Sequence, residues 1–154
     1  MKMTLFLVGR CLSVGIWGIF LAACAGYGHG RGDAAAGTEL PLQRGYYVAG
    51  DTPCGEASNA TLVLLRRDGI SSARDFCAFD AIERTGVATF RVVESCVDLQ
   101  GDGAPVTGVR IYEIPDDSSF TSTGDTGWVH SARRCPQSSL PAEWRADDIR
   151  ELIE

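Results

Sequence analysis

Four cysteines beyond residue 50 constrain the fold of this chain more than any other feature. They are Cys54, Cys77, Cys96 and Cys135. The gaps between them are too long for a four-cysteine zinc site, in which paired ligands usually lie two to four residues apart. An even set of cysteines in a short domain instead predicts two disulfides and an oxidising compartment. We therefore expect a small disulfide-stapled domain with no metal and no other cofactor.

Short segments with strand character lie around these cysteines. Their residues are aromatic, β-branched or alternately apolar, and turn-forming residues separate them. The segments are residues 45–49, 60–66, 76–83, 88–97, 108–114 and 127–133. Strands that recur between turn signals predict a mainly β fold. We expect a small antiparallel sheet, curved or closed into a barrel or sandwich.

Two of the predicted strands have clear expected ends. Arg67, Asp68 and Gly69 form a plausible tight turn in which the glycine would take a positive φ angle. The strand at residues 108–114 is expected to stop at Pro115.

One assumed hairpin predicts the disulfide connectivity. If residues 86–87 form a two-residue turn with Gly86 first, as a type II′ turn prefers, Cys77 lies directly opposite Cys96. Directly opposed residues are close enough for a cross-strand disulfide. Four cysteines allow three connectivities. This register favours Cys77–Cys96 and leaves Cys54–Cys135 by elimination.

The first 23 residues have the pattern of a secretory signal. Lys2 and Arg10 are basic, residues 11–23 are apolar, and small residues end the apolar run. The run of 13 residues is shorter than the roughly 20 that a helix needs to span a bilayer, so a cleaved leader is favoured over a permanent anchor. The closing sequence Leu-Ala-Ala-Cys, residues 21–24, resembles the lipobox of bacterial lipoproteins.

This resemblance implies a protein tethered to a membrane by lipid on Cys24. The thiol would carry diacylglycerol, and an acyl chain such as palmitate would modify the new amino terminus. Ala25 rather than Asp follows Cys24. By the resemblance, this favours the outer membrane, with the protein facing the periplasm. We expect a signal peptide at residues 1–23, a flexible glycine-rich tether at 24–42 and the β domain at 43–154.

The net charge of the chain limits the classes of partner that it can bind. The whole chain has a formal net charge of −6, and the part from Cys24 onward has 12 arginines, no lysine and 20 acidic residues, a formal charge of −8. An acidic surface repels nucleic acid and suits a basic protein. We therefore expect no nucleic-acid partner.

Two patterns offer chemistry, and neither is complete. His130 is the one histidine in the predicted domain, and Asp102 or Asp125 could complete a Ser-His-Asp site. Ser131, however, would point to the opposite face of the strand. We predict no catalytic residue and no enzyme activity.

Residues 98–103 resemble half of a calcium-binding loop. Counted from Asp98, the twelfth position is Val109, where the full loop needs a carboxylate. A polar hairpin between strands is favoured over a metal site.

The end of the chain changes character. Residues 142–154 have early acids and apolar residues near one face, which predicts a short helix docked on the sheet. The alternative is a frayed tail that binds a partner through Trp144.

The general plan of lipobox, linker and acidic β domain is similar to that of small envelope lipoproteins that inhibit lysozyme. It implies a binding or inhibitory module, and its partner could be a basic protein such as a lysozyme-type enzyme. The alternatives are a structural or assembly lipoprotein that docks on an envelope complex, and a hydrolase that uses His130.

Overall fold

The computed structural model describes residues 36–37 and 39–154. The predicted signal sequence and the proposed lipidation site Cys24 lie outside these residues. The strands of the described part are β1 (Ala36–Gly37), β2 (Gly45–Ala49), β3 (Leu62–Leu65), β4 (Gly69–Ser71), β5 (Asp75–Arg84), β6 (Thr89–Asp98), β7 (Val106–Asp116), β8 (Ser119–Gly124) and β9 (Val129–Arg134).

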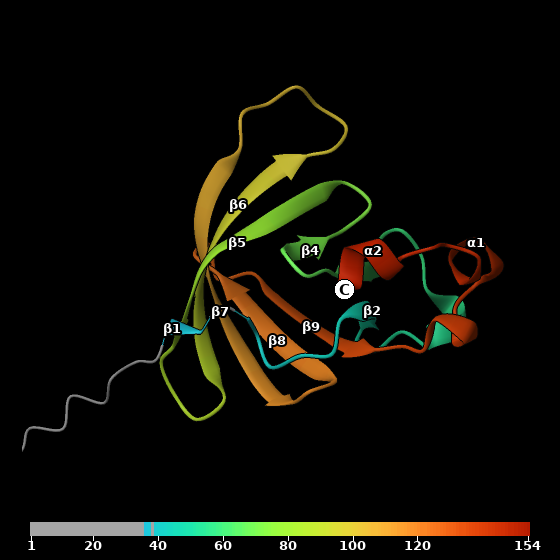
Figure 1. Ribbon diagram of the computed structural model, residues 1–154, viewed down its shortest axis with the longest axis horizontal. Helices are drawn as coiled ribbons and strands as arrows, with labels where there is room; N and C mark the ends of the chain where they lie inside the picture. The colour runs from blue at the N-terminus through green and yellow to red at the C-terminus, as the bar shows by residue number, and fades with distance from the viewer. Residues whose placement is uncertain (1–35, 38) are drawn as a thin grey trace, which may run out of the picture. The chain divides into compact units, whose positions relative to one another are not determined.

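Eight of the strands, β2 to β9, close into a barrel. Hydrogen-bonded neighbours follow the order β5-β4-β3-β2-β9-β8-β7-β6, and β6 pairs again with β5 (Figure 1). Every pairing is antiparallel, which confirms the predicted mainly β class and selects the barrel from the two expected architectures. The two-residue strand β1 lies outside this ring and pairs with Ile82 and Glu83 of β5.

The β5–β6 hairpin brings Cys77 opposite Cys96 as predicted, but its turn and strand register differ from those assumed. Thr85 N–H donates to the carbonyl of Thr89, so the loop holds three residues, 86–88, and not two. Strand β5 contains a bulge at Asp80 that shifts the register back by one. Cys77 therefore lies opposite Cys96 as predicted, and the two are bonded. The second predicted disulfide, Cys54–Cys135, is also present.

Two predicted strand ends are wrong in detail. Gly69 does not have a positive φ angle. A Cβ atom there would lie 2.1 Å from the carbonyl oxygen of Cys77, so the glycine is needed for close approach of β4 to β5. Strand β7 also continues through Pro115, because an irregularity between Glu113 and Asp116 takes the missing donor out of the ladder.

The barrel interior holds the larger hydrophobic core. The alternation of side chains places every second residue of each strand inside. The buried residues of this cluster are Leu40, Leu42, Tyr47, Leu65, Ile82, Phe90, Val92, Tyr112, Ile114, Phe120 and Ala132.

Residues just before β2 belong to this core. Leu40 and Leu42 are buried, and β1 is paired with β5. The predicted boundary at residue 43 is therefore too late, because part of the segment assigned to a flexible tether packs into the barrel.

A second core lies on the outside of β2 and β3. It joins Tyr46, Val48 and Leu62 to the end of the chain, where Leu140 and Ile149 are buried. Two short 3-10 helices, η1 (Cys54–Glu56) and η2 (Gln137–Ser139), lie beside it, and the disulfide Cys54–Cys135 links the two segments. Strand β2 is buried on both faces because it separates the two cores.

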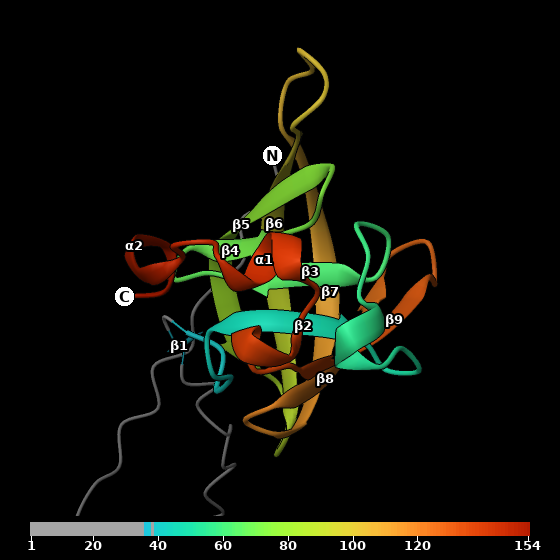
Figure 2. The same ribbon diagram turned by 90° about the vertical axis from the view of Figure 1, so that its right-hand side faces the viewer.

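The C-terminal segment forms two single-turn helices, α1 (Ala142–Arg145) and α2 (Arg150–Ile153), where one helix was predicted (Figure 2). Trp144 and Ile153 pack against the second core, and Tyr46 donates a hydrogen bond of 2.8 Å to Asp147. The alternative of a frayed tail is wrong, because the segment is docked. Among the described residues, no helix has the length and apolar character that crossing a membrane requires.

Candidate binding site

One end of the barrel encloses a cavity of about 390 Å³. Its lining comes from all eight strands of the ring or the turns that join them, at the end where β5, β7 and β9 begin and β6 and β8 finish. Several inward residues there are small, which leaves the space open. The lining residues are Ala49, Ala60, Val63, Ile70, Ser72, Asp75, Cys77, Glu94, Arg110, Tyr112, Ser122, Trp128 and His130.

A buried carboxylate lies in the wall of this cavity. Glu94 of β6 is only 3% exposed. Its Oε1 accepts a hydrogen bond of 2.7 Å from the hydroxyl of Tyr112, and its Oε2 accepts one of 3.1 Å from Nε of Arg110. Both partners stand on β7, which pairs with β6. The fold therefore satisfies both oxygens of this buried charge, as burial requires.

The tyrosine is the donor in this group. Burial raises the pKa of Tyr112 well above its ordinary value, and the neighbouring charge of Glu94 raises it further. Tyr112 therefore keeps its proton near neutral pH, and its hydroxyl is the donor in the hydrogen bond to Glu94.

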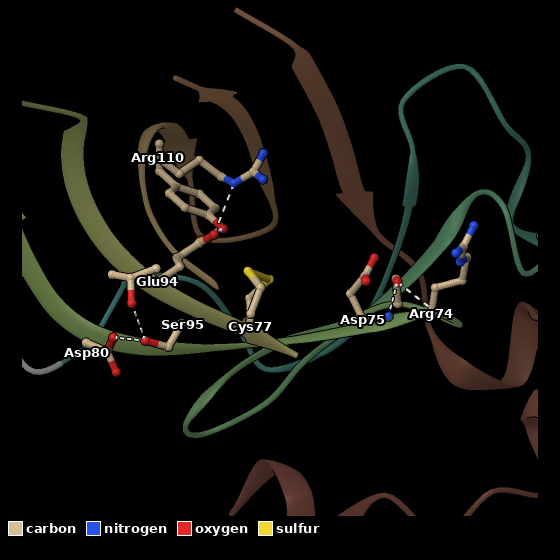
Figure 3. The surroundings of a disulfide bond; sticks show 11 residues. Arg74, Asp75, Cys77, Asp80, Glu94, Ser95 and Arg110 are labelled. Atoms are coloured by element: carbon tan, nitrogen blue, oxygen red, sulfur yellow. Dashed lines mark hydrogen bonds and ion pairs between the residues drawn. A yellow bond between two sulfur atoms is a disulfide. The ribbon is translucent and has the colours of Figure 1, made fainter. Parts of the chain in front are cut away.

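The Cys77–Cys96 disulfide lies against the carboxylate of Glu94. A Glu94 oxygen and the two sulfur atoms are all within 4.8 Å of one another. Figure 3 shows Cys77 beside Glu94, with Arg110 meeting the carboxylate from the other side. Because the sulfur atoms are bonded to each other, this triplet offers no thiolate to a metal. The disulfide instead fixes β5 to β6 where they form the cavity wall.

The β8–β9 turn places an aromatic pair at the mouth. The backbone N–H of Gly124 donates a hydrogen bond of 3.0 Å to the carbonyl of Trp128 and closes a three-residue loop. Within this loop Gly127 has a φ angle of 79°. Such a loop favours glycine at its last position. It leaves Trp128 59% exposed, with its ring stacked on His130 at 5.5 Å between centroids. Arg110 lies 6.0 Å from the Trp128 ring.

His130 is held uncharged near neutral pH. Burial lowers the pKa of His130 below its ordinary value of 6.5, and the positive charge of Arg110 lowers it further. Phe120 contacts the ring edge-on at 5.9 Å. In this environment the neutral imidazole ring forms part of the wall at the mouth of the cavity.

The residues considered for catalysis do not come together. Ser131 points away from the cavity, and its hydroxyl is 2.9 Å from that of Thr121. Asp102 and Asp125 are exposed in loops at the ends of hairpins. In the described part of the chain, neither carboxylate is hydrogen-bonded to His130.

The half calcium loop is a polar hairpin, as expected. Asp98 accepts a hydrogen bond of 2.8 Å from the backbone of Gln100 and so caps the turn. Among the described residues, no three carboxylates, histidines or cysteines gather in residues 98–103.

Sequence reasoning missed Glu94 and Arg110. A usable signal was present, because Phe90, Val92 and Glu94 alternate along one predicted strand and therefore share a face. A carboxylate in a row of inward apolar residues needs a partner, which is the mark of an internal polar site.

Comparison with protein-family models, with curated proteins and with solved structures gives no match for this chain.

Proposed function

We propose that this protein is a binding module of the bacterial cell envelope, anchored through lipid on Cys24, with the open end of the barrel as its binding site. The observation that carries the proposal is the cavity of about 390 Å³ with a built polar group in its wall. Its size lies in the range typical of small-molecule sites, about 300–1,000 Å³. Eight-stranded barrels are wide enough to hold one small ligand.

The two disulfides and the leader support an exported protein. Both disulfides require an oxidising compartment to form and persist. The Leu-Ala-Ala-Cys sequence at residues 21–24 supports lipidation. Intact mass spectrometry of the protein from membranes tests this part. We expect a chain that begins at Cys24, carries acyl groups and contains two disulfides, whereas a retained leader contradicts the anchor.

A neutral fluorescent dye tests binding in the cavity. N-phenyl-1-naphthylamine brightens in apolar surroundings and carries no charge that would select a head group. We expect saturable one-site binding. Ala49→Phe fills the cavity from β2 and should abolish binding, whereas Ala104→Phe, in an exposed loop, should not. Absent binding, or equal binding by the Ala49→Phe variant, contradicts the proposal.

A protein ligand is the second candidate, and the mouth of the cavity favours it. Trp128 lines the cavity and is 59% exposed there. Aromatic side chains commonly anchor interfaces, and an acidic chain suits a basic partner such as a lysozyme-type enzyme. Titration against several basic lysozymes, with Trp128→Ala as the matched variant, tests this. If none of the lysozymes is inhibited, this candidate is rejected.

A further inference from the structure

We propose that the cavity binds a small amphipathic carboxylate, with its head group on the terminal nitrogens of Arg110 and its apolar part inside the barrel mouth. This inference rests on the proposed function and names the ligand class for that same site.

The guanidinium of Arg110 has N–H donors that the fold does not use. Its Nε is bonded to Glu94, and within the described residues its two terminal nitrogens make no hydrogen bond. The side chain is 26% exposed, and it lines the cavity. The free edge of a guanidinium carries two parallel donors that match the two oxygens of a carboxylate. Arg110 therefore offers a preformed anion site.

Glu94 does not offer the opposite site. Each oxygen of Glu94 already accepts a hydrogen bond, from Tyr112 or Arg110, and its side chain is only 4% exposed against 26% for Arg110, so little of the carboxylate is open to a cationic ligand. Glu94 also holds the guanidinium in place, so its role in the site is to position Arg110.

The rest of the lining suits an apolar body. Val63 and Ile70 supply aliphatic surface, and Trp128 supplies a ring at the entrance. Because Arg110 lies over that ring, a ligand held by the guanidinium would place its apolar part against Trp128.

One charge opposes this arrangement and provides a test of it. Asp75 also lines the cavity, on an exposed part of β5. Its carboxylate should weaken the binding of an anion and strengthen that of a cation. Asp75→Asn therefore changes the two affinities in opposite directions without touching the buried core.

The experiment compares three ligands with the same eight-carbon chain: octanoate, octanol and octylammonium. The probe is the Trp fluorescence of the full chain, with Trp128→Phe identifying the part of the signal that comes from the mouth. We expect octanoate to bind at least about tenfold more tightly than octanol, the difference a charged hydrogen-bonded pair gives. Asp75→Asn should tighten octanoate and weaken octylammonium.

Arg110→Lys is the decisive variant. It keeps a positive charge beside Glu94 but loses the paired donors. We expect it to lose most of the preference for octanoate while octanol still binds, which also shows that the barrel is folded. Arg91→Lys is the matched control, because Arg91 alternates with Phe90 and Val92 and so lies on the outer face of β6.

The outcomes separate this inference from the proposed function. Equal or tighter binding of octylammonium, or an Arg110→Lys variant that keeps the octanoate preference, overturns the carboxylate assignment even though the neutral dye still binds. No response to octanoate also overturns it. Failure of the neutral dye together with all three ligands overturns both proposals.

Discussion

The hydroxyl of Tyr112 donates a hydrogen bond of 2.7 Å to the carboxylate of Glu94, and both side chains are almost fully enclosed by the barrel. Loss of this donor leaves an oxygen of a buried charge without its partner. Bonds to charged groups contribute about 1.5–3 kcal/mol, against about 1 kcal/mol for neutral pairs.

Tyr112→Phe should therefore lower the free energy of unfolding by about 1.5–3 kcal/mol. Tyr47→Phe is the matched control, because the Tyr47 hydroxyl donates to the neutral backbone carbonyl of Gln43 at 2.7 Å. Urea denaturation of both variants measures the difference. Equal losses in the two variants would contradict the assignment of a charged acceptor to Tyr112.

His130 should make the fold sensitive to mild acid. Its pKa is lowered in the folded state by burial and by Arg110, so the unfolded chain takes up the proton at a higher pH. Stability from this group is complete above its ordinary pKa of about 6.5 and falls as the pH drops below that value. Urea midpoints between pH 7.5 and 5 should fall more steeply for the wild type than for His130→Asn. Parallel curves would show that His130 does not contribute.

The two disulfides should contribute unequally to stability. Cys54–Cys135 joins residues 81 apart in sequence, and Cys77–Cys96 joins residues 19 apart. Since the longer closed loop restricts the unfolded chain more, removing Cys54–Cys135 should cost about 1 kcal/mol more. Replacement of each pair by alanine, followed by urea denaturation, measures this. A larger loss from the Cys77–Cys96 pair would mean that its position in the cavity wall outweighs loop length.

Gly69→Ala should disrupt the β4–β5 pairing. The new Cβ would lie 2.1 Å from the carbonyl oxygen and 2.9 Å from the carbonyl carbon of Cys77, and backbone atoms cannot move aside as a flexible side chain can. We expect a lower yield of folded protein and a lower thermal midpoint. Gly103→Ala is the control, because nothing lies within 4 Å of its Cβ position. A stable Gly69→Ala protein would refute this close contact.

The C-terminal segment should be needed for folding. Ile149 is buried in the second core, so Ile149→Ala should destabilise the protein by about 2–5 kcal/mol. Leu99 is 57% exposed, and Leu99→Ala should change stability by less than about 0.5 kcal/mol. Chemical denaturation compares the two. A harmless Ile149→Ala would mean that the segment docks without contributing to stability.

The pattern of strands was readable from the sequence, but their exact register was not. Cys77 and Cys96 were paired correctly because two errors cancelled: the loop at residues 86–88 is one residue longer than assumed, and a bulge at Asp80 compensates. No local signal marked that bulge. Strands β4 and β8 were missed for a related reason, since their pairing comes from neighbours in the ring.

The cavity as a whole could not be predicted, because its lining comes from all eight strands of the closed ring. Glu94 and Arg110 lie on the neighbouring strands β6 and β7, but their contact depends on the register of that pair, which the sequence does not mark. His130 was considered from the sequence only as the base of a hydrolase, which was the less favoured alternative. The structure places it in the lining of the cavity with its ring stacked on Trp128, a contact that the sequence does not mark.

The small strand β1 has a consequence for how copies of this protein behave toward one another. Strand β4 pairs with residues 76–78 of β5, and β1 pairs with residues 82–83 on the part of β5 that β4 does not reach. Without β1, that stretch of backbone would be an open edge on which another polypeptide could add a strand. With β1 in place, the backbone of Ile82 and Glu83 is already paired, so this part of β5 is not open to a strand from another copy.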